Sequence, residues 1–419
     1  MALVIIVGSA LGAPDDRQST SVAARAINAL GIELLRQTAK PDANALLSPY
    51  SIQSALAMAY AGAEGDTRDE MARVLHYPKD ESQLHSSFTA LRKSLDEVVM
   101  QSAKYAENSV AIGKMARPAD PIVLNVASRL FGQSGYDFRP AFLRLLRDDY
   151  AAPFQPVDFI HGSTDAMKLI NDWIANQTQQ HIRDVIPQGA LGTLSRLVLV
   201  NAVYFKAPWK KRFLEGATKP APFHLNGNAA VDVATMTQTE ELGYAKGDGF
   251  CALELPYIGT RLRFIVILPH NVDGLAAVEK NFTFEAVTSQ LRWEERYVTI
   301  HMPKFVMEPA PLSLGEALQN LGMKKAFDQP EGSADFSRMT PQPGTNDLFI
   351  SQLLQKAILS IDENGSIAAT AAYQAFATRG GIRENLKPVE VRVDHPFLFL
   401  IEHTGSRACL FLGHLTDPR

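Results

Sequence analysis

The sequence contains very little cysteine: only Cys251 and Cys409 occur among 419 residues, each inside an apolar run. A fold held together by disulfides needs a denser set of cysteines, so we expect two buried free thiols, with a single disulfide as the alternative. Two cysteines are also too few, and too far apart in the sequence, for a zinc knuckle.

An excess of one charge is missing as well, because 41 Lys and Arg residues face 45 Asp and Glu residues. A dedicated nucleic-acid-binding protein usually carries a basic excess, so we predict no nucleic-acid partner. Hydrophobic residues make up 46% of the chain and charged residues 21%, which excludes an intrinsically disordered protein. No apolar run reaches the length that spans a bilayer, and we predict no membrane partner.

Motifs of common enzyme chemistry are also missing. The sequence has no His-Glu-x-x-His zinc motif, no Walker A loop and no Gly-x-Ser-x-Gly elbow, and Gly247-Asp248-Gly249 lacks the third glycine of a dinucleotide fingerprint. We therefore predict a protein that is not an enzyme and that uses no metal and no cofactor.

Residues 1–13 are apolar and end in small residues directly before Pro14. This pattern is typical of a secretory signal peptide, and a buried N-terminal strand is the alternative. We expect a secreted, extracellular protein whose mature chain spans 14–419. Because no repeat, low-complexity tract or Gly/Ser-rich linker interrupts that chain, we expect a single domain.

Hydrophobic periodicity predicts helices mainly in the first half of the chain and strands in the second. Helices are expected over 51–63 and near 165–178, and a capping box from Thr67 to Glu70 indicates the start of another. Strands are expected over 197–205, 262–268, 297–302, 357–361, 389–393, 397–401 and 408–412. Residues 197–200 are apolar on both faces, which predicts a central strand covered on both sides. This order of elements indicates an α+β fold.

The segment 364–381 fits neither pattern, because it is rich in small residues and lies between two expected strands. Its composition suits a helix, since alanine is the best helix former, and it also suits a long exposed loop.

Eight motifs follow one another along the chain: Asn44–Ile52, Gly62–Thr67, Leu197–Trp209, Pro303–Phe305, Leu321–Met323, Ala334–Ser337, Asp394–Phe399 and Phe411–Leu415. Their residues and their order resemble the serpin family, from about residue 20 to residue 418. The resemblance implies a single-domain serpin fold of about nine helices and three β-sheets, with an exposed reactive centre loop at about 364–388.

The resemblance also implies a hinge at the start of that loop, comprising Glu363, Gly365, Ser366, Ala368, Ala369, Thr370, Ala371 and Ala372. In serpins the loop, once cleaved by a protease, inserts into the main sheet as a new strand. Insertion needs a permissive pivot, here Gly365, and small side chains on the inward face, here the alternating positions 366, 368, 370 and 372. The segment 364–378 contains no proline and no charged residue, both of which would oppose insertion.

In inhibitory serpins the bait residue lies sixteen positions after the hinge glutamate, which implies Arg379 followed by Gly380; the bond between Arg383 and Glu384 is the alternative. Arginine suits a trypsin-like serine protease, whose primary pocket holds a carboxylate. The implied mechanism is suicide inhibition. The protease serine attacks the Arg379 carbonyl to give a covalent acyl-enzyme, and the inserting loop carries the protease across the sheet before deacylation.

Three further residues match the serpin shutter, a polar cluster beneath the main sheet: Ser48, Ser51 and Asn201. Gln355 stands where the shutter usually has a histidine, and an amide there can still bridge hydroxyl groups. Trp209 matches a tryptophan at the place where the hinge enters the sheet. Helix capping and ordinary core packing are the alternatives for these residues.

Two other functions stay open: a non-inhibitory serpin that acts as a binding or carrier protein, and a cross-class inhibitor of papain-like cysteine proteases. Arg92 and Lys93 form the one adjacent basic pair in the region where heparin-binding serpins carry a basic helix. We therefore expect no strong heparin site, and we expect a monomer.

Overall fold

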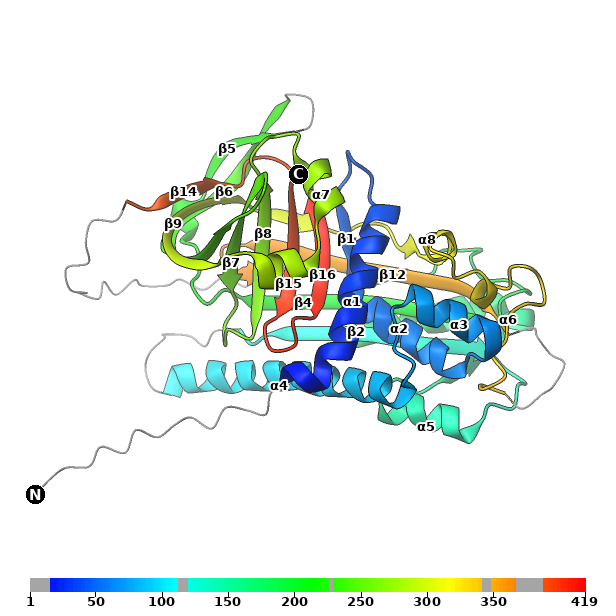
Figure 1. The fold of residues 1–419 in the computed structure, drawn as a ribbon. Coiled ribbons are helices and arrows are strands. Elements are labelled where there is room, and N and C mark those ends of the chain that lie inside the picture. Colours follow the sequence, from blue (N-terminus) through cyan, green and yellow to red (C-terminus); the bar gives the residue numbers. More distant parts are fainter. Residues whose placement is uncertain (1–15, 112–119, 226–228, 341–347, 367–386) are drawn as a thin grey trace, which may run out of the picture.

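The computed structural model describes residues 16–111, 120–225, 229–340, 348–366 and 387–419 (Figure 1). Most of the helices lie in the first half of the chain and most strands in the second, which confirms the predicted α+β order. The described residues contain eight α-helices, against about nine expected: α1 (Asp16–Thr38), α2 (Pro49–Gly62), α3 (Gly65–Val74), α4 (Glu81–Ala111), α5 (Pro140–Asp148), α6 (Phe159–Gln177), α7 (Leu275–Asn281) and α8 (Gly315–Asn320).

Seven strands form what we call the main sheet, in which the long strands β2, β4 and β12 run side by side (Figure 1). They are β10 (Phe305–Met307), β11 (Leu312–Ser313), β12 (Ile350–Asp362), β13 (Gly365–Ser366), β4 (Leu197–Pro208), β2 (Val123–Gln133) and β3 (Gln155–Val157).

Nine strands form what we call the second sheet: β1 (Ala45–Leu47), β16 (Cys409–Leu415), β15 (Phe397–His403), β8 (Leu262–Pro269), β7 (Phe250–Pro256), β6 (Ala230–Lys246), β9 (Glu294–Pro303), β14 (Val389–Arg392) and β5 (Lys219–His224). Two sheets among the described residues replace the three expected because β6 is 17 residues long. Its first part pairs with β5 and its last part with β7, so one strand joins what would otherwise be separate sheets.

Strand β4 is the predicted central strand, and every residue in it except Lys206 is buried. Alternate side chains enter two different cores. Leu199, Val203 and Phe205 face the large core between the two sheets. Val198, Val200 and Tyr204 face a smaller core beneath α6.

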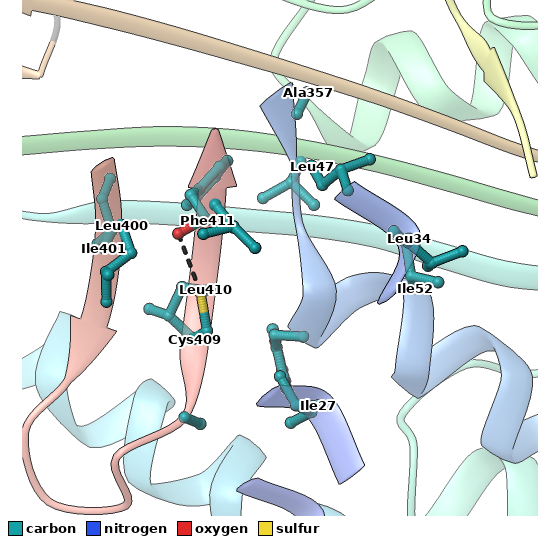
Figure 2. Close-up of a cluster of buried hydrophobic side chains, with 14 of the residues drawn as sticks. Ile27, Leu34, Leu47, Ile52, Ala357, Leu400, Ile401, Cys409, Leu410 and Phe411 are labelled. Atoms are coloured by element: carbon teal, nitrogen blue, oxygen red, sulfur yellow. Dashed lines mark hydrogen bonds between the residues drawn. The ribbon is translucent and has the colours of Figure 1, made fainter. Parts of the chain in front are cut away.

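Helix α2 lies between the sheets and contacts β2 and β4 on one side and β16 on the other. All of its residues except Ser54 are buried, because apolar and small residues occur around its whole circumference. Figure 2 shows this core, where side chains of α1, β1, α2, β15 and β16 meet. Cys409 is buried there and its thiol donates to the Phe411 carbonyl oxygen at 3.0 Å. Both cysteines are free, as predicted, although Cys251 is only partly buried.

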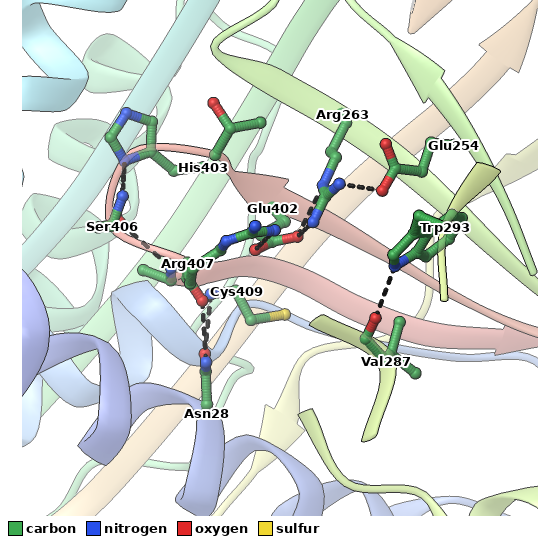
Figure 3. Close-up of polar contacts among 12 residues, drawn as sticks. Asn28, Glu254, Arg263, Val287, Trp293, Glu402, His403, Ser406, Arg407 and Cys409 are labelled. Carbon is green, nitrogen blue, oxygen red and sulfur yellow. Dashed lines mark hydrogen bonds and ion pairs between the residues drawn. The ribbon is translucent and has the colours of Figure 1, made fainter. Parts of the chain in front are cut away.

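One buried charge cluster joins three strands of the second sheet. Arg263 of β8 lies between the carboxylates of Glu402 on β15 and Glu254 on β7 (Figure 3). Burial disfavours the charged guanidinium, but the two carboxylates outweigh it and raise the pKa of Arg263. The three charges therefore depend on one another, since removing one partner leaves another buried without compensation.

The predicted capping box at Thr67 is wrong. Helix α3 begins at Gly65, so Thr67 lies inside its first turn and is buried. Its hydroxyl accepts the amide of Asp335 at 2.9 Å, and the Glu70 carboxylate accepts the amides of Lys324 and Lys325. The two side chains fix a distant segment to α3 and leave the start of the helix uncapped by them, because tertiary contacts compete for the same oxygens.

Candidate functional site

Two hinge residues, Gly365 and Ser366, already lie in the main sheet. Strand β13, formed by Gly365 and Ser366, pairs antiparallel with Asp362 and Ile361 of β12 and with Pro208 and Ala207 of β4. Farther along, β12 and β4 pair directly and in parallel, from Ile358 opposite Tyr204 to Ile350 opposite Leu197. The sheet is thus closed over most of its length and holds the hinge residues Gly365 and Ser366 at one end.

The registers of the three strand pairs, β12 with β13, β13 with β4 and β12 with β4, are consistent with one another. Continuing the pairing of β13 along both neighbours brings one inserted residue opposite Ile358 and Tyr204, which are themselves paired now. The same holds for Gln355 and Asn201. Separating β4 from β12 sideways would therefore admit a strand without any shift along the strand direction.

Gly365 adopts a backbone that favours glycine, with φ at +141°. A Cβ atom at this position would lie 2.1 Å from the carbonyl oxygen of Ala207 and 2.7 Å from the Cα atom of Pro208. The close approach to β4 therefore requires glycine, which adds a steric reason to the flexibility expected of the pivot.

Ser366 is fully buried, and its hydroxyl lies 3.0 Å from the hydroxyl of Tyr257, which is also fully buried. The ring of Tyr257 stacks on Trp209, with ring centroids 4.7 Å apart and an angle of 7° between the planes. Trp209 in turn donates its indole N–H to the Asp362 carbonyl oxygen at 2.9 Å, and its amide donates to Asn364. Trp209 thus lies where the hinge enters the sheet, as the resemblance implies.

Two neighbouring carboxyl groups hold the turn before β13. Burial raises the pKa of Asp362 even though its carboxylate accepts the amides of Asn364 and Gly365, at 2.8 and 3.2 Å. Burial also disfavours ionised Glu363, but Lys304 at 2.8 Å and the Thr218 hydroxyl at 2.6 Å outweigh it and lower the pKa of this carboxyl. Glu363 is therefore a charged anchor at the start of the hinge.

The polar cluster beneath the sheet contains only part of the predicted shutter. The Ser51 hydroxyl donates to Oδ1 of Asn201 at 2.5 Å, and Nδ2 of Asn201 donates to the Ser128 hydroxyl at 2.8 Å. These contacts join α2, β4 and β2. Ser48 is buried next to the cluster, but its hydroxyl donates to the Leu410 carbonyl oxygen of β16.

The side-chain donor of Gln355 does not bridge to a hydroxyl group of this cluster. Gln355 lies directly opposite Asn201 in the sheet and is buried, yet its Nε2 has no hydrogen-bond partner among the described residues. A buried donor without an acceptor destabilises the closed sheet at this position.

Sequence reasoning missed Tyr257, Thr218 and Ser128. Nothing in the spacing of these residues marks them, because each comes from an element distant in sequence from its partner. The remaining predicted site residues lie outside the described residues: Ala368, Ala369, Thr370, Ala371, Ala372, Arg379, Gly380, Arg383 and Glu384.

The described residues show no other chemical site of a recognised kind. Across 16–111, 120–225, 229–340, 348–366 and 387–419, no three His, Cys, Asp or Glu side chains are grouped as a metal site would require. Within the same ranges, none of the helices has the length and apolar character needed to cross a membrane. Arg92 is paired with Asp96 at 3.2 Å, while Lys93 is exposed.

Comparisons with known proteins agree with this geometry. A family model described as "Serpin (serine protease inhibitor)" matches residues 25–418. The leukocyte elastase inhibitor of Bos taurus is 36% identical over 90% of this chain and 94% of its own length. An uncharacterized serpin-like protein of Thermococcus kodakarensis is 35% identical over 94% of this chain and 85% of its own length. Among solved structures, uncleaved ovalbumin matches with a TM-score of 0.78 and 27% identity, over 94% of this chain and all of that chain.

Proposed function

The chain belongs to the serpin family, and from this we propose that it is a suicide inhibitor of trypsin-like serine proteases with Arg379–Gly380 as its bait bond. The observation that carries the proposal is the position of Gly365 and Ser366 between β12 and β4, in registers that continue into the closed sheet. A strand that extends from this start can enter the sheet by breaking only the direct pairs of β4 with β12.

The orientation of Ser366 indicates which side chains of an inserted strand would face the large core. Its side chain faces Tyr257 in the large core, so residues 368, 370 and 372 would face the same way in an inserted strand. All three are small in this sequence. Residue 372 would lie between Asn201 and Gln355, so the strand would pass directly over the polar cluster. These features favour an inhibitory serpin over a carrier, which has no need of small residues at these positions.

The target class rests on the side chain of the bait residue. Arginine at 379 is the ligand that a trypsin-type pocket with a carboxylate at its base selects. The protease serine would attack the Arg379 carbonyl, the peptide bond to Gly380 would break, and the amine of Gly380 would leave with the C-terminal fragment. Insertion would then have to outpace hydrolysis of the acyl-enzyme by water.

The first experiment is incubation with trypsin, followed by denaturing gels and mass spectrometry of the released C-terminal fragment. We expect a complex that survives denaturation and a fragment that begins at Gly380. Arg379→Ala should abolish the complex, and Arg383→Ala is the matched control that should keep it. A fragment beginning at Glu384 would move the bait bond to Arg383. Complete cleavage without any complex would contradict the inhibitory proposal and favour a carrier.

Leukocyte elastase is a second candidate target, because relatives 33–36% identical to this chain are named inhibitors of it. The elastase pocket is small and does not accept arginine, so elastase would have to cleave after a small residue such as Ala377. The same gel with elastase, and with papain for the cysteine-protease alternative, separates these targets. A stable complex with elastase that persists in Arg379→Ala would favour this second candidate.

Secretion is a separate proposal that rests on residues 1–13. Expression of the full chain in a secreting host should release protein whose N-terminus is Pro14. Retention in the cell with the N-terminal residues uncleaved would contradict it.

A further inference from the structure

The segment 178–196 joins the end of α6 to the start of β4, and we call it the α6–β4 segment. The ring of His181 in this segment stacks on Tyr204 of β4, with ring centroids 3.9 Å apart and an angle of 3° between the planes. Farther along, the Ala190 carbonyl oxygen accepts the side-chain amide of Gln352 on β12 at 3.4 Å. The segment therefore contacts both of the strands that an entering strand would separate.

The α6–β4 segment covers one face of the junction between β4 and β12. Tyr204 and Ile358, which pair directly across the junction, belong to the same small core as the segment. Asn171 ties the segment to α6, because its side chain donates to the Ile186 carbonyl oxygen at 3.0 Å and accepts the Ile186 amide at 2.9 Å. The buried residues of the segment in this core are Ile182, Val185, Ile186 and Leu191.

Three residues of the segment adopt a left-handed backbone although they are not glycine: φ is +52° at Gln179, +67° at Gln180 and +53° at Asp184. A Cβ atom makes this conformation costly, so it persists only where surrounding contacts hold it. All three residues are exposed, so packing of their own side chains does not compensate. The packed segment is thus strained, and the His181 stack and the buried apolar side chains hold it in place.

Entry of a strand between β4 and β12 would disrupt these contacts. Neighbouring strands lie about 4.8 Å apart, so an entering strand would double the separation of Tyr204 and Ile358. In the register described above, residue 373, a tyrosine, would lie between Val200 and Leu354 with its side chain towards the small core. Because protein cores are close-packed, the α6–β4 segment would have to leave this face to admit it.

We propose that the α6–β4 segment controls how fast a strand enters the main sheet. The stack of His181 on Tyr204 slows entry, because entry breaks it. The strained backbone of Gln179, Gln180 and Asp184 speeds entry, because lifting the segment relieves the strain. His181 is thus a positioning residue for the insertion step. The inference rests on the proposed function, in which insertion traps the protease, but strand entry can be measured without a protease.

The test measures how fast the purified, intact full chain takes up a fluorescent synthetic peptide with the sequence of residues 367–378, followed on native gels. His181→Ala lacks the stack and should take up the peptide about threefold faster or more. His181→Phe keeps a planar ring over Tyr204 and should restore the wild-type rate. His270→Ala, at an exposed histidine after β8, is the matched control that should change nothing.

The double variant Gln179→Gly/Gln180→Gly tests the strain and should change the rate in the opposite direction. Glycine adopts the left-handed backbone freely, so the packed segment becomes more stable and uptake should be about twofold slower or more. Gln188→Gly is the matched control, since Gln188 is exposed in the same segment without a positive φ.

Equal uptake by the wild type and His181→Ala, uptake by His181→Phe as fast as that by His181→Ala, or faster uptake by the double glycine variant would each overturn the inference. Uptake too slow to detect in every variant would overturn it as well, because loss of the stack would then not open the sheet. Failure of the proposed function gives a different result: trypsin would cleave the protein without a stable complex, while the uptake rates would still follow the expected order.

Discussion

The hydroxyl groups of Tyr257 and Ser366 form a buried pair that fixes the hinge in the sheet. Tyr257→Phe removes one partner and leaves the Ser366 hydroxyl buried without a bond, which should lower the free energy of unfolding by about 1–3 kcal/mol. Urea unfolding measures the change, and Tyr297→Phe, at an exposed tyrosine, is the control.

The double variant Tyr257→Phe/Ser366→Ala tests whether the two hydroxyl groups depend on each other. Since it removes both partners, it should be more stable than the sum of the two single changes predicts. Strictly additive changes would show that this contact does not contribute to holding the hinge.

Gly365 admits no side chain where it passes β4. Gly365→Ala would place a methyl group against the Ala207 carbonyl oxygen, so we expect β13 to leave the sheet. Hydrogen exchange should then show lost protection of the Ser366 amide. Gly192→Ala is the matched control, because no atom lies within 4 Å of the Cβ position there. Unchanged protection of the Ser366 amide in Gly365→Ala would contradict this account of the pivot.

Single residues differ in how far the sequence reveals them. Gly365 and Trp209 could be predicted because they lie within motifs of a known family. Tyr257 could not, since its role depends on a stacking partner and on a serine more than a hundred positions away. The unpartnered Nε2 of Gln355 could not be predicted either, since it depends on which groups the fold places around that amide.

At the scale of elements, Glu81 joins the start of α4 to two other segments. Its carboxylate pairs with Arg68 at 2.8 Å, Arg338 at 3.0 Å and His85 at 3.2 Å. Burial disfavours the ionised form, but these partners outweigh it and lower the pKa of Glu81 to about 2. The ionised carboxylate is therefore favoured in the folded state.

A lowered pKa means that the stabilisation is complete above the ordinary value of 4.5 and is lost as the pH falls towards 2. Because Glu81 is partly exposed, solvent screening reduces its contribution to about 1 kcal/mol. Glu81→Gln should lower the free energy of unfolding by that amount at pH 6, and the difference should disappear near pH 2. Glu107→Gln, an exposed position on the same helix, should have no effect at either pH. If the free energies of unfolding of Glu81→Gln and the wild type differed by the same amount from pH 6 to pH 2, the ionised Glu81 carboxylate would not be the source of this stabilisation.

The sequence reveals elements better than their ends. Helix α6 begins at Phe159, earlier than expected, because the Asp158 carboxylate caps it by accepting the amides of Ile160 and His161. Strand β12 extends back to Ile350, although polar residues such as Gln352 and Gln355 interrupt the apolar pattern there. Pairing with β4 supplies the hydrogen bonds that the local pattern does not predict.

At the scale of the whole molecule, the central question is the state of the main sheet. An intact and a cleaved serpin share one sequence, so no residue pattern reveals whether β4 and β12 are neighbours. In this structure they pair directly from Ile350 to Ile358, and of the described residues Gly365 and Ser366 lie between them at one end. In the mechanism we propose, a strand that enters would replace the one set of backbone pairs between β4 and β12 by two sets, one with each neighbour.

The most direct test is a crystal structure of the protein after cleavage of the loop between residues 379 and 380. The account predicts a new strand between β4 and β12 that continues from Ser366 without a change of register, with residue 372 between Asn201 and Gln355. Direct pairing of Tyr204 with Ile358 in the cleaved protein would contradict it.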